Sequence, residues 1–412
     1  MIRLLEGIRV LECAMLPTGD QTSRLLGDLG ADVIKIERPG TGDYLRELGD
    51  RITPQNSVFH LLCNRNKRSV ELDLRSDEGR GIFFDLLRTA DIFVDGFAGD
   101  ACDKLGIGYA AQTEVKSDII YCQASGFGAR GPYGQIPVHG YMMGAVAGQE
   151  QYEIDDEGVV RQVINPQGQY FSGSIDGPLS TALYAGLTAV AALRHRDLTG
   201  EGAYIDAAGA DSVLANQCLD AVMSWNAERV TDRRNPPPPV GMDPRKRPKY
   251  TWYRTKDDKI VLFAAIEHKF WDNFCRAVGR EDLLEVKNTT FAVDFADGGR
   301  RDLLDELVPV FRERTAAEWV DIARRYDIPL SPANSKLDLL SDEHLRAREI
   351  VHDSVHPVAG PYTSTGWPAP VTGQPFDLRR PAPALGQHTE EVLAELGLSA
   401  DEVAGLRKRG VA

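Results

Sequence analysis

One histidine, His139, stands in an otherwise apolar run of twelve residues, PVHGYMMGAVAG (137–148). Imidazole is well suited to move a proton near neutral pH, because its ordinary pKa lies in that range. Met142 and Met143 follow it and offer a soft, adaptable apolar surface. Two hypotheses follow from this pattern. His139 either transfers a proton beside an apolar substrate, or is a buried core histidine held by one hydrogen bond.

Composition excludes several other kinds of site. The six cysteines include no CxxC pair and do not stand near histidines at metal-ligand spacing, which predicts reduced structural thiols and no metal. A net charge of −14 argues against nucleic acid, although a small anion could still bind a local basic pocket. No apolar run reaches the roughly 18 residues of a membrane span. The acidic residues in MIRLLEGIRVLECAML are untypical of a signal peptide, so we expect a cytoplasmic protein.

The elements that must position these groups alternate between strands and helices. Short apolar runs predict strands, and amphipathic runs between them predict helices, one of which opens with Ser76 as N-cap. This alternation is typical of βαβ units around a mostly parallel sheet. A longer helix, apolar nearly all round and therefore expected to be buried, runs from about Leu179 to His195. The strands are expected at 8–14, 33–37, 69–74, 91–97 and 118–128, and the first two helices at 21–30 and 76–87.

Four consecutive prolines within residues 231–249 predict a stiff linker between two domains. The segment before it, 1–230, is expected to form a large α/β domain. The segment after it, 250–350, is expected to form a smaller α+β domain that opens with a hairpin. Residues 351–412 are predicted to be a tail that returns to the large domain, irregular at first and ending in a helix at 388–397.

The chain carries four ordered motifs, GDLGADVIKIERPGTGD (27–43), NRNKRSVELDLR (64–75), QASGFGARGPYG (123–134) and RHRDLTGEGAYID (194–206). Together they resemble the CaiB/BaiF superfamily, which contains the family III CoA-transferases and the α-methylacyl-CoA racemases. The resemblance extends from about Leu5 to beyond Leu283. It implies a Rossmann-like large domain with a parallel sheet, a smaller α+β domain, and an interlocked homodimer whose active sites lie between domains of two subunits.

The resemblance also implies a set of CoA-binding positions. Cations at strand ends suit the phosphates of CoA, and an apolar pair suits its adenine. No cofactor is expected beyond the CoA that the substrate itself carries. One departure is the run GFAG (96–99), which replaces an NFRPG-like run of the family and loses its asparagine. The implied cations are Arg38, Arg75 and Lys104, and the implied apolar pair is Leu72 and Phe97.

The resemblance leaves two reactions open, and the catalytic motifs favour a racemase. A racemase needs proton-transfer groups on both faces of the α-carbon. His139 ends GPYGQIPVH (131–139), where racemases carry their histidine and transferases commonly carry tyrosine. Glu267, in AAIEHKFWDNF (264–274), matches the racemase glutamate that orients this histidine, and Asp176 is the implied second base. The first hypothesis is therefore a 2-methylacyl-CoA racemase or epimerase.

Two alternatives remain. The first is a family III CoA-transferase in which the Asp176 carboxylate attacks the thioester and CoA passes to a second acid. The second is a non-catalytic CoA-binding subunit of a heteromeric transferase. The spacing of Asp176 from the LTG motif differs from the usual transferase spacing, and Gly140 replaces an acid that is common in the family. Asp176 could also be a helix N-cap, since Asp-Gly-Pro-Leu suits a helix start.

Overall fold

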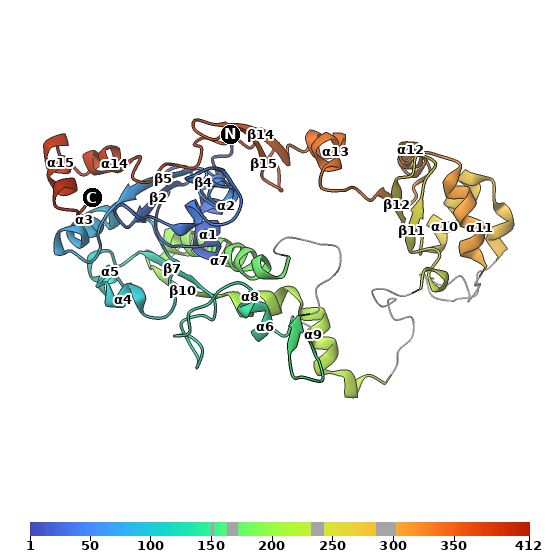
Figure 1. The fold of residues 1–412 in the computed structure, drawn as a ribbon, viewed down its shortest axis with the longest axis horizontal. Helices are drawn as coiled ribbons and strands as arrows, with labels where there is room; N and C mark the ends of the chain where they lie inside the picture. The colour runs from blue at the N-terminus through green and yellow to red at the C-terminus, as the bar shows by residue number, and fades with distance from the viewer. Residues whose placement is uncertain (150–151, 163–171, 232–242, 286–301) are drawn as a thin grey trace. The chain divides into compact units, whose positions relative to one another are not determined.

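The computed structural model describes all residues except 150–151, 163–171, 232–242 and 286–301 (Figure 1). The described chain forms two compact units. The first comprises Met1–Trp225 and Ala347–Ala412, and the second comprises Asn226–Arg346. The predicted linker at 231–249 falls largely on 232–242, outside the described residues.

The first unit is built on a six-stranded sheet in which every neighbouring pair is parallel. The chain adds strands on one side of β1 and then crosses back to add the others, so the order reverses beside β1. In doubly wound folds this reversal leaves a crevice at the carboxyl ends of the strands. The predicted α/β class with a parallel sheet is confirmed. The order is β10 (Ala203–Ala208), β7 (Ile120–Ser125), β6 (Ile92–Asp95), β1 (Arg9–Cys13), β2 (Asp32–Glu37) and β5 (Lys67–Glu71).

Helices cover both faces of this sheet, because the strand residues alternate between two apolar cores. On one face, α1 (Pro17–Asp28) and α7 (Ser172–Thr199) pack on strand residues such as Val10 and Ile92. On the other, α3 (Asp77–Leu87), α14 (Thr389–Glu395) and α15 (Ala400–Lys408) pack on residues such as Leu11 and Phe93. Figure 1 shows the red C-terminal helices α14 and α15 beside the blue α3. Segments from both ends of the chain therefore close one core.

Two helix predictions need correction. Helix α1 begins at Pro17 rather than at residue 21, with Pro17 in its first turn, where a missing N–H costs nothing. Helix α7 begins at Ser172 rather than at Leu179, and it is not buried on all sides. Its side chains Leu183 and Leu187 are 59% and 70% exposed. The sequence could not separate an apolar helix buried in a core from one that keeps an apolar face open.

The predicted irregular tail contains a hairpin. Strand β14 (Val351–His356) pairs with antiparallel β15 (Gly360–Thr365), and Gly360 takes the positive φ of +77° that the turn requires. Alternation in VHDSVH and the β-branched residues of PYTST were the available signals. The predicted helix at 388–397 corresponds to α14. Residues 347–412 belong to the first unit.

The second unit places a small sheet against three helices. Strands β11 (Thr251–Arg254), β12 (Ile260–Phe263) and β13 (Leu330–Pro332) are antiparallel. Helices α10 (His268–Val278), α11 (Leu303–Arg312) and α12 (Ala316–Tyr326) enclose an aromatic core with them. In that core the rings of Phe311 and Trp319 lie 4.7 Å apart.

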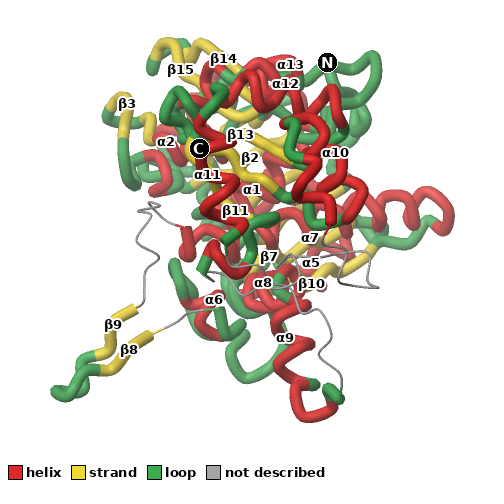
Figure 2. Tube along the Cα trace, turned by 90° about the vertical axis from the view of Figure 1, so that its right-hand side faces the viewer, coloured by secondary structure: helices red, strands yellow, loops and turns green. Residues whose placement is uncertain are grey.

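Shorter elements complete the chain, and Figure 2 shows β8 and β9 as a two-stranded hairpin. In the described part of the chain, no helix combines the length and the apolar character needed to cross a bilayer. The short elements are β3 (Arg51–Thr53), β4 (Asn56–Ser57), α2 (Val58–Cys63), α4 (Ala101–Lys104), α5 (Tyr109–Val115), α6 (Met142–Val146), β8 (Tyr152–Ile154), β9 (Val160–Gln162), α8 (Gly209–Asn216), α9 (Cys218–Trp225) and α13 (Glu343–Ala347).

Candidate functional site

A cavity of about 490 Å³ opens at the carboxyl ends of four neighbouring strands, β6, β1, β2 and β5. This is the position beside the reversal of strand order where doubly wound folds bind ligands. All five residues implied for CoA binding line it, so the structure gathers them in one place. Their binding of CoA stays a prediction. They are Arg38, Leu72, Arg75, Phe97 and Lys104.

The cations of this cavity differ in their surroundings. Arg38 directly follows β2, and Arg75 lies four residues after β5. Both side chains are exposed, and among the described residues neither guanidinium has a hydrogen-bond partner. Lys104 Nζ instead lies 2.7 Å from Asp100 Oδ1. Two open guanidinium groups at a cavity lined by Leu72 and Phe97 suit a ligand that carries both phosphates and an aromatic base.

A buried ion cluster holds the loop after β2 in place. Lys35 Nζ lies 2.6 Å from Asp20 Oδ1, 2.7 Å from Glu12 Oε1 and 3.0 Å from Asp43 Oδ2, and Lys67 Nζ lies 2.6 Å from Glu12 Oε2. Burial and the Asp43 carboxylate raise the pKa of Asp20 well above its usual value. Burial also acts to raise the pKa of Asp43. The Lys35 ammonium and several hydrogen bonds outweigh this effect, so that the pKa of Asp43 falls to about 2. Asp43 also lines the cavity, so the cluster fixes part of its wall.

Asp95, the last residue of β6, shapes the opposite wall. Its Oδ1 accepts the Phe97 backbone N–H at 2.9 Å, and its Oδ2 accepts the Tyr121 hydroxyl at 2.7 Å. Burial raises the pKa of Asp95 to about 6, although both hydrogen bonds act to lower it. The carboxyl therefore sets the backbone position of Phe97, whose ring lines the cavity.

The asparagine missing from the GFAG run has a steric explanation. A Cβ at Gly96 would collide with the Ala14 side chain and lie 2.9 Å from Ala14 Cα. A Cβ at Gly19, in the first turn of α1, would lie 2.9 Å from Gly96 Cα. The ends of β1 and β6 and the start of α1 are thus packed too closely for any side chain at residue 96.

His139 lies three residues before α6, and its imidazole is exposed. Its carbonyl accepts the Met142 N–H at 3.2 Å, but the ring has no hydrogen-bond partner among the described residues. The hypothesis of a buried core histidine is therefore wrong. Met142 is 37% exposed, in keeping with a soft surface beside the imidazole.

Met143 instead serves to pack α6 against two other helices. It is buried, and a Cβ at Gly177 of α7 would lie 2.5 Å from its Sδ. A Cβ at Gly209 of α8 would collide with the same sulfur. Only glycines allow this close approach, which brings the segment that follows His139 against the turn of α7 next to Asp176.

Asp176 lies within the first turns of α7, and its side chain is exposed. The N-cap interpretation of Asp176 is wrong, because the helix already begins at Ser172. Asp176 Oδ2 accepts a hydrogen bond from Gln149 Nε2 at 3.3 Å. Both side chains line a cavity of about 200 Å³ together with Ser180, Asn216 and Gln217.

Glu267 belongs to the second unit, where it occupies the N-cap position of α10. Its carbonyl accepts the N–H groups of Phe270 and Trp271 at 3.1 Å, and its half-buried side chain makes no capping bond. His139 belongs to the first unit. The pairing of Glu267 with His139 stays a prediction.

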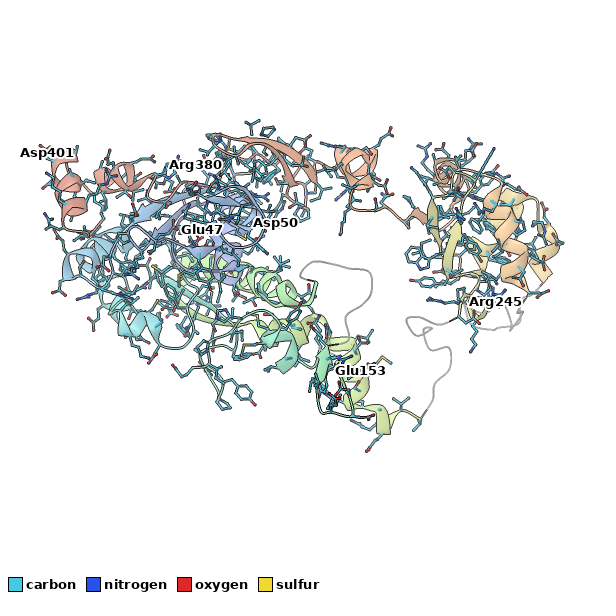
Figure 3. The ribbon with its side chains drawn as sticks, viewed as in Figure 1. Glu47, Asp50, Glu153, Arg245, Arg380 and Asp401 are labelled. Atoms are coloured by element: carbon cyan, nitrogen blue, oxygen red, sulfur yellow. The ribbon has the colours of Figure 1, made fainter. Side chains whose placement is uncertain are left out.

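A second cavity, of about 890 Å³, is lined by parts of residues 40–56 and 356–388. It shares Thr41 and Asp43 with the first, and Glu47 and Arg380, labelled in Figure 3, also line it. The sequence predicts no function for its lining. None of the six cysteines forms a disulfide. Within the described ranges, no three His, Cys, Asp or Glu side chains are grouped so that they could hold a metal ion.

A sequence profile described as CoA-transferase family III matches residues 5–389. The chain belongs to CoA-transferase family III. Its curated relatives include a formyl-CoA:oxalate CoA-transferase of Rhodopseudomonas palustris (strain BisA53), 28% identical over 100% of this chain and 97% of that protein. A succinyl-CoA:glutarate CoA-transferase of Homo sapiens is 27% identical over 96% of this chain and 86% of that protein.

Two solved structures share the fold of this chain. A CaiB/BaiF family protein from Brucella suis is 25% identical, with a TM-score of 0.72 over 96% of this chain and 100% of that chain. The Rv3272 protein of Mycobacterium tuberculosis has a TM-score of 0.73 at 23% identity, over 94% and 98% of the two chains. The CaiB/BaiF resemblance is confirmed. Because the relatives carry transferase names, they favour the transferase alternative over the racemase that the motifs predict first.

Sequence reasoning about this family III chain missed two parts of the site. Asp43 lines the cavity of about 490 Å³, and Asp95 supports its wall through the Phe97 backbone. The place of Asp95 at the end of β6 was the available signal, whereas Asp43 lies six residues after β2. Gln149 was missed because a lone glutamine after a glycine carries no signal of its own. Only the packing of α6 on α7 brings it to Asp176.

Proposed function

We propose that this family III protein transfers CoA from an acyl-CoA thioester to a carboxylic acid, with Asp176 as its nucleophile. The observation that carries the proposal is the accessible carboxylate of Asp176 in the unit that also holds the predicted CoA cavity. Membership of the family supports it. So do the transferase names of relatives that align over nearly the whole chain.

The proposed chemistry uses one carboxylate twice. An Asp176 oxygen attacks the thioester carbonyl carbon, and the C–S bond breaks. CoA departs as its thiolate, and the acyl group stays on Asp176 as a mixed anhydride. The thiolate then attacks the aspartyl carbonyl, which releases the first acid and forms an aspartyl-CoA thioester. The acceptor carboxylate displaces CoA in the same way, and the thiolate attacks the new acyl group. This last step returns Asp176 as a free carboxylate and releases the new acyl-CoA.

Trapping the covalent intermediate tests this proposal. The protein is incubated with succinyl-CoA and treated with hydroxylamine or borohydride, and its peptides are weighed by mass spectrometry. We expect a hydroxamate or an alcohol at Asp176, and none in Asp176→Asn. Asp220→Asn, which changes an exposed acid of α9 in the same unit, should still be modified at Asp176. Deuterium uptake at the α-carbon with no second acid and no adduct would contradict the transferase.

For substrates, we propose short carboxylic acids, with a dicarboxylate on at least one side of the exchange. The names of the relatives support this choice, since each pairs a small acyl-CoA with oxalate or glutarate. The test offers formyl-CoA and succinyl-CoA as donors, and oxalate, glutarate and monocarboxylates of matched length as acceptors. Faster transfer to the monocarboxylates than to either dicarboxylate would contradict this part of the proposal.

We also propose that the protein acts as a homodimer, as the resemblance implies. The open apolar face of α7 supports this, since Leu183 and Leu187 are both exposed. Helix α9 adds exposed side chains of Leu219, Met223 and Trp225. Apolar surface of this kind is typical of a face that a protein partner covers.

A further inference from the structure

The side chain of Gln149 is held in place by the end of helix α6. Gly148 has a φ of +75°, the left-handed conformation that commonly ends a helix. Its N–H donates to the Ala145 carbonyl at 3.2 Å, and the Gln149 N–H donates to the Gly144 carbonyl at 2.8 Å. These two bonds form a Schellman motif, which fixes the backbone from which the Gln149 side chain extends.

The orientation of the Gln149 amide follows from its partner. A carboxylate that acts as a nucleophile is ionised and can only accept hydrogen bonds. The group that faces Asp176 Oδ2 at 3.3 Å must therefore be the donor Nε2, and the Gln149 carbonyl oxygen Oε1 points elsewhere.

That carbonyl oxygen is an acceptor without a donor. Gln149 Oε1 is buried and has no hydrogen-bond partner among the described residues. Buried polar atoms are almost always paired, and an unpaired one costs the free energy of its lost hydration. Gln149 lines the cavity of about 200 Å³ that also holds Asp176, so a ligand that enters there meets the side chain that carries this oxygen.

The identity of that donor rests on the proposed function. The acids that exchange CoA are ionised carboxylates and bring no N–H group. The pantetheine arm of an acyl-CoA carries an amide two carbons from the thioester sulfur, and this amide must come close to Asp176 when the thioester carbonyl does. We propose that Gln149 Oε1 accepts the N–H of this amide while Gln149 Nε2 holds Asp176 Oδ2, so that one side chain aligns the nucleophile with its substrate.

A pair of unreactive ligands tests the contact without depending on catalysis. One is the S-ethyl thioether of CoA, and the other is the same molecule with an ester oxygen in place of the amide N–H nearest the sulfur. The wild type should bind the amide ligand about tenfold more tightly, the size of one well-formed hydrogen bond. Gln149→Leu should bind the two equally. Isothermal titration gives both dissociation constants, and their ratio within one variant does not depend on its folded fraction.

A matched variant separates this contact from a general effect on the cavity. Gln217→Leu makes the same change of residue in the same cavity, at a position with no hydrogen bond to Asp176 among those found in the structure. It should keep the tenfold preference for the amide. An undiminished preference in Gln149→Leu, or no preference in the wild type, would overturn the proposal.

Failure of the contact and failure of the reaction give different results. If trapping labels Asp176 but Gln149→Leu keeps the amide preference, the transferase stands and the role of Gln149 is wrong. If no adduct forms but the preference still depends on Gln149, the pantetheine contact stands and the transferase is wrong.

Discussion

At the scale of single residues, the predicted CoA cavity depends on charged groups in opposite situations. Asp95 is buried and holds the backbone beside Phe97, whereas the guanidinium of Arg75 is exposed and has no partner in the described structure. Burial disfavours the charge of the first, and water stabilises the charge of the second. Substitution of Asp95 should therefore change how stability depends on pH, whereas substitution of Arg75 should change the affinity for CoA.

We expect Asp95→Asn to become more stable relative to the wild type as the pH rises. Burial raises the pKa of Asp95 to about 6 from an ordinary 3.8, so the folded wild type holds this proton more tightly than the unfolded chain does. The stabilisation that this bound proton gives the folded wild type is therefore lost as the pH rises from the unfolded pKa through the folded pKa. Asparagine does not titrate, so the stability of the variant does not fall for this reason. Between about pH 5 and pH 7.5 the relative gain should be roughly 1.4 kcal/mol, which denaturant titration can measure. A difference that is independent of pH would contradict this assignment.

Arg75→Ala should weaken CoA binding by about ten- to a hundredfold, because one charge-assisted phosphate contact contributes about 1.5–3 kcal/mol. Isothermal titration with CoA measures this change. Arg88→Ala is the control, since Arg88 pairs with Asp85 on the exposed surface of the same region and lines neither of the two large cavities. An unchanged dissociation constant in Arg75→Ala would remove this residue from the site.

At the scale of elements, close approach of backbone decides where the functional side chains stand. The Met143 side chain packs α6 against Gly177 of α7 and Gly209 of α8. The absence of a side chain at Gly96 allows the end of β6 to approach β1 and the start of α1. The Lys35 cluster ties the first two strands to the start of α1 and to the loop after β2. Together, the close backbone contacts and the buried ion pairs set the positions of Asp176 and of the cavity walls.

Gly148→Ala should lower stability by about 1 kcal/mol, because alanine is strained at positive φ. It should also weaken the preference for the amide ligand, since it disturbs the Schellman motif that holds Gln149. Gly158→Ala imposes the same strain at a φ of +82°, in the turn of the β8–β9 hairpin, where an added Cβ meets no atom within 4 Å. That control should lose stability and keep the ligand preference. If both variants lost the preference for the amide ligand equally, the Schellman motif would not be what positions Gln149 for this contact.

At the scale of the whole molecule, the chain leaves apolar surface open on α7 and α9 of the first unit. The double variant Leu183→Glu, Leu187→Glu should shift the protein from the mass of two chains toward that of one, because a second copy would have to bury both charges. Sedimentation velocity measures this shift. Val358→Glu, at an exposed position in the turn of the β14–β15 hairpin, is the control and should keep the mass of the wild type. A wild type that sediments as a single chain would contradict the dimer.

The parallel sheet could be predicted because short, largely apolar runs, such as IFVD in β6, alternate along the chain with amphipathic helices. The start of α1 could not, because Thr18, Gly19 and Asp20 are polar or flexible in sequence yet buried in the fold. Their burial depends on partners far along the chain, such as Lys35 for Asp20. Asp176 and His139 were found through motifs. Gln149 was not, since its place is set by how two helices pack rather than by its neighbours in sequence.

The order in which the chain is made has a consequence for its folding. The first unit is discontinuous, because residues 226–346 form the second unit before Ala347–Ala412 return. During synthesis from the N-terminus, Phe83 and Phe93 therefore lack the cover of α14 and α15 until the last residues emerge. The second unit is contiguous and can collapse while this surface is still exposed to water. Return of the C-terminal segment is then the step that closes the first unit, and aggregation competes with that step.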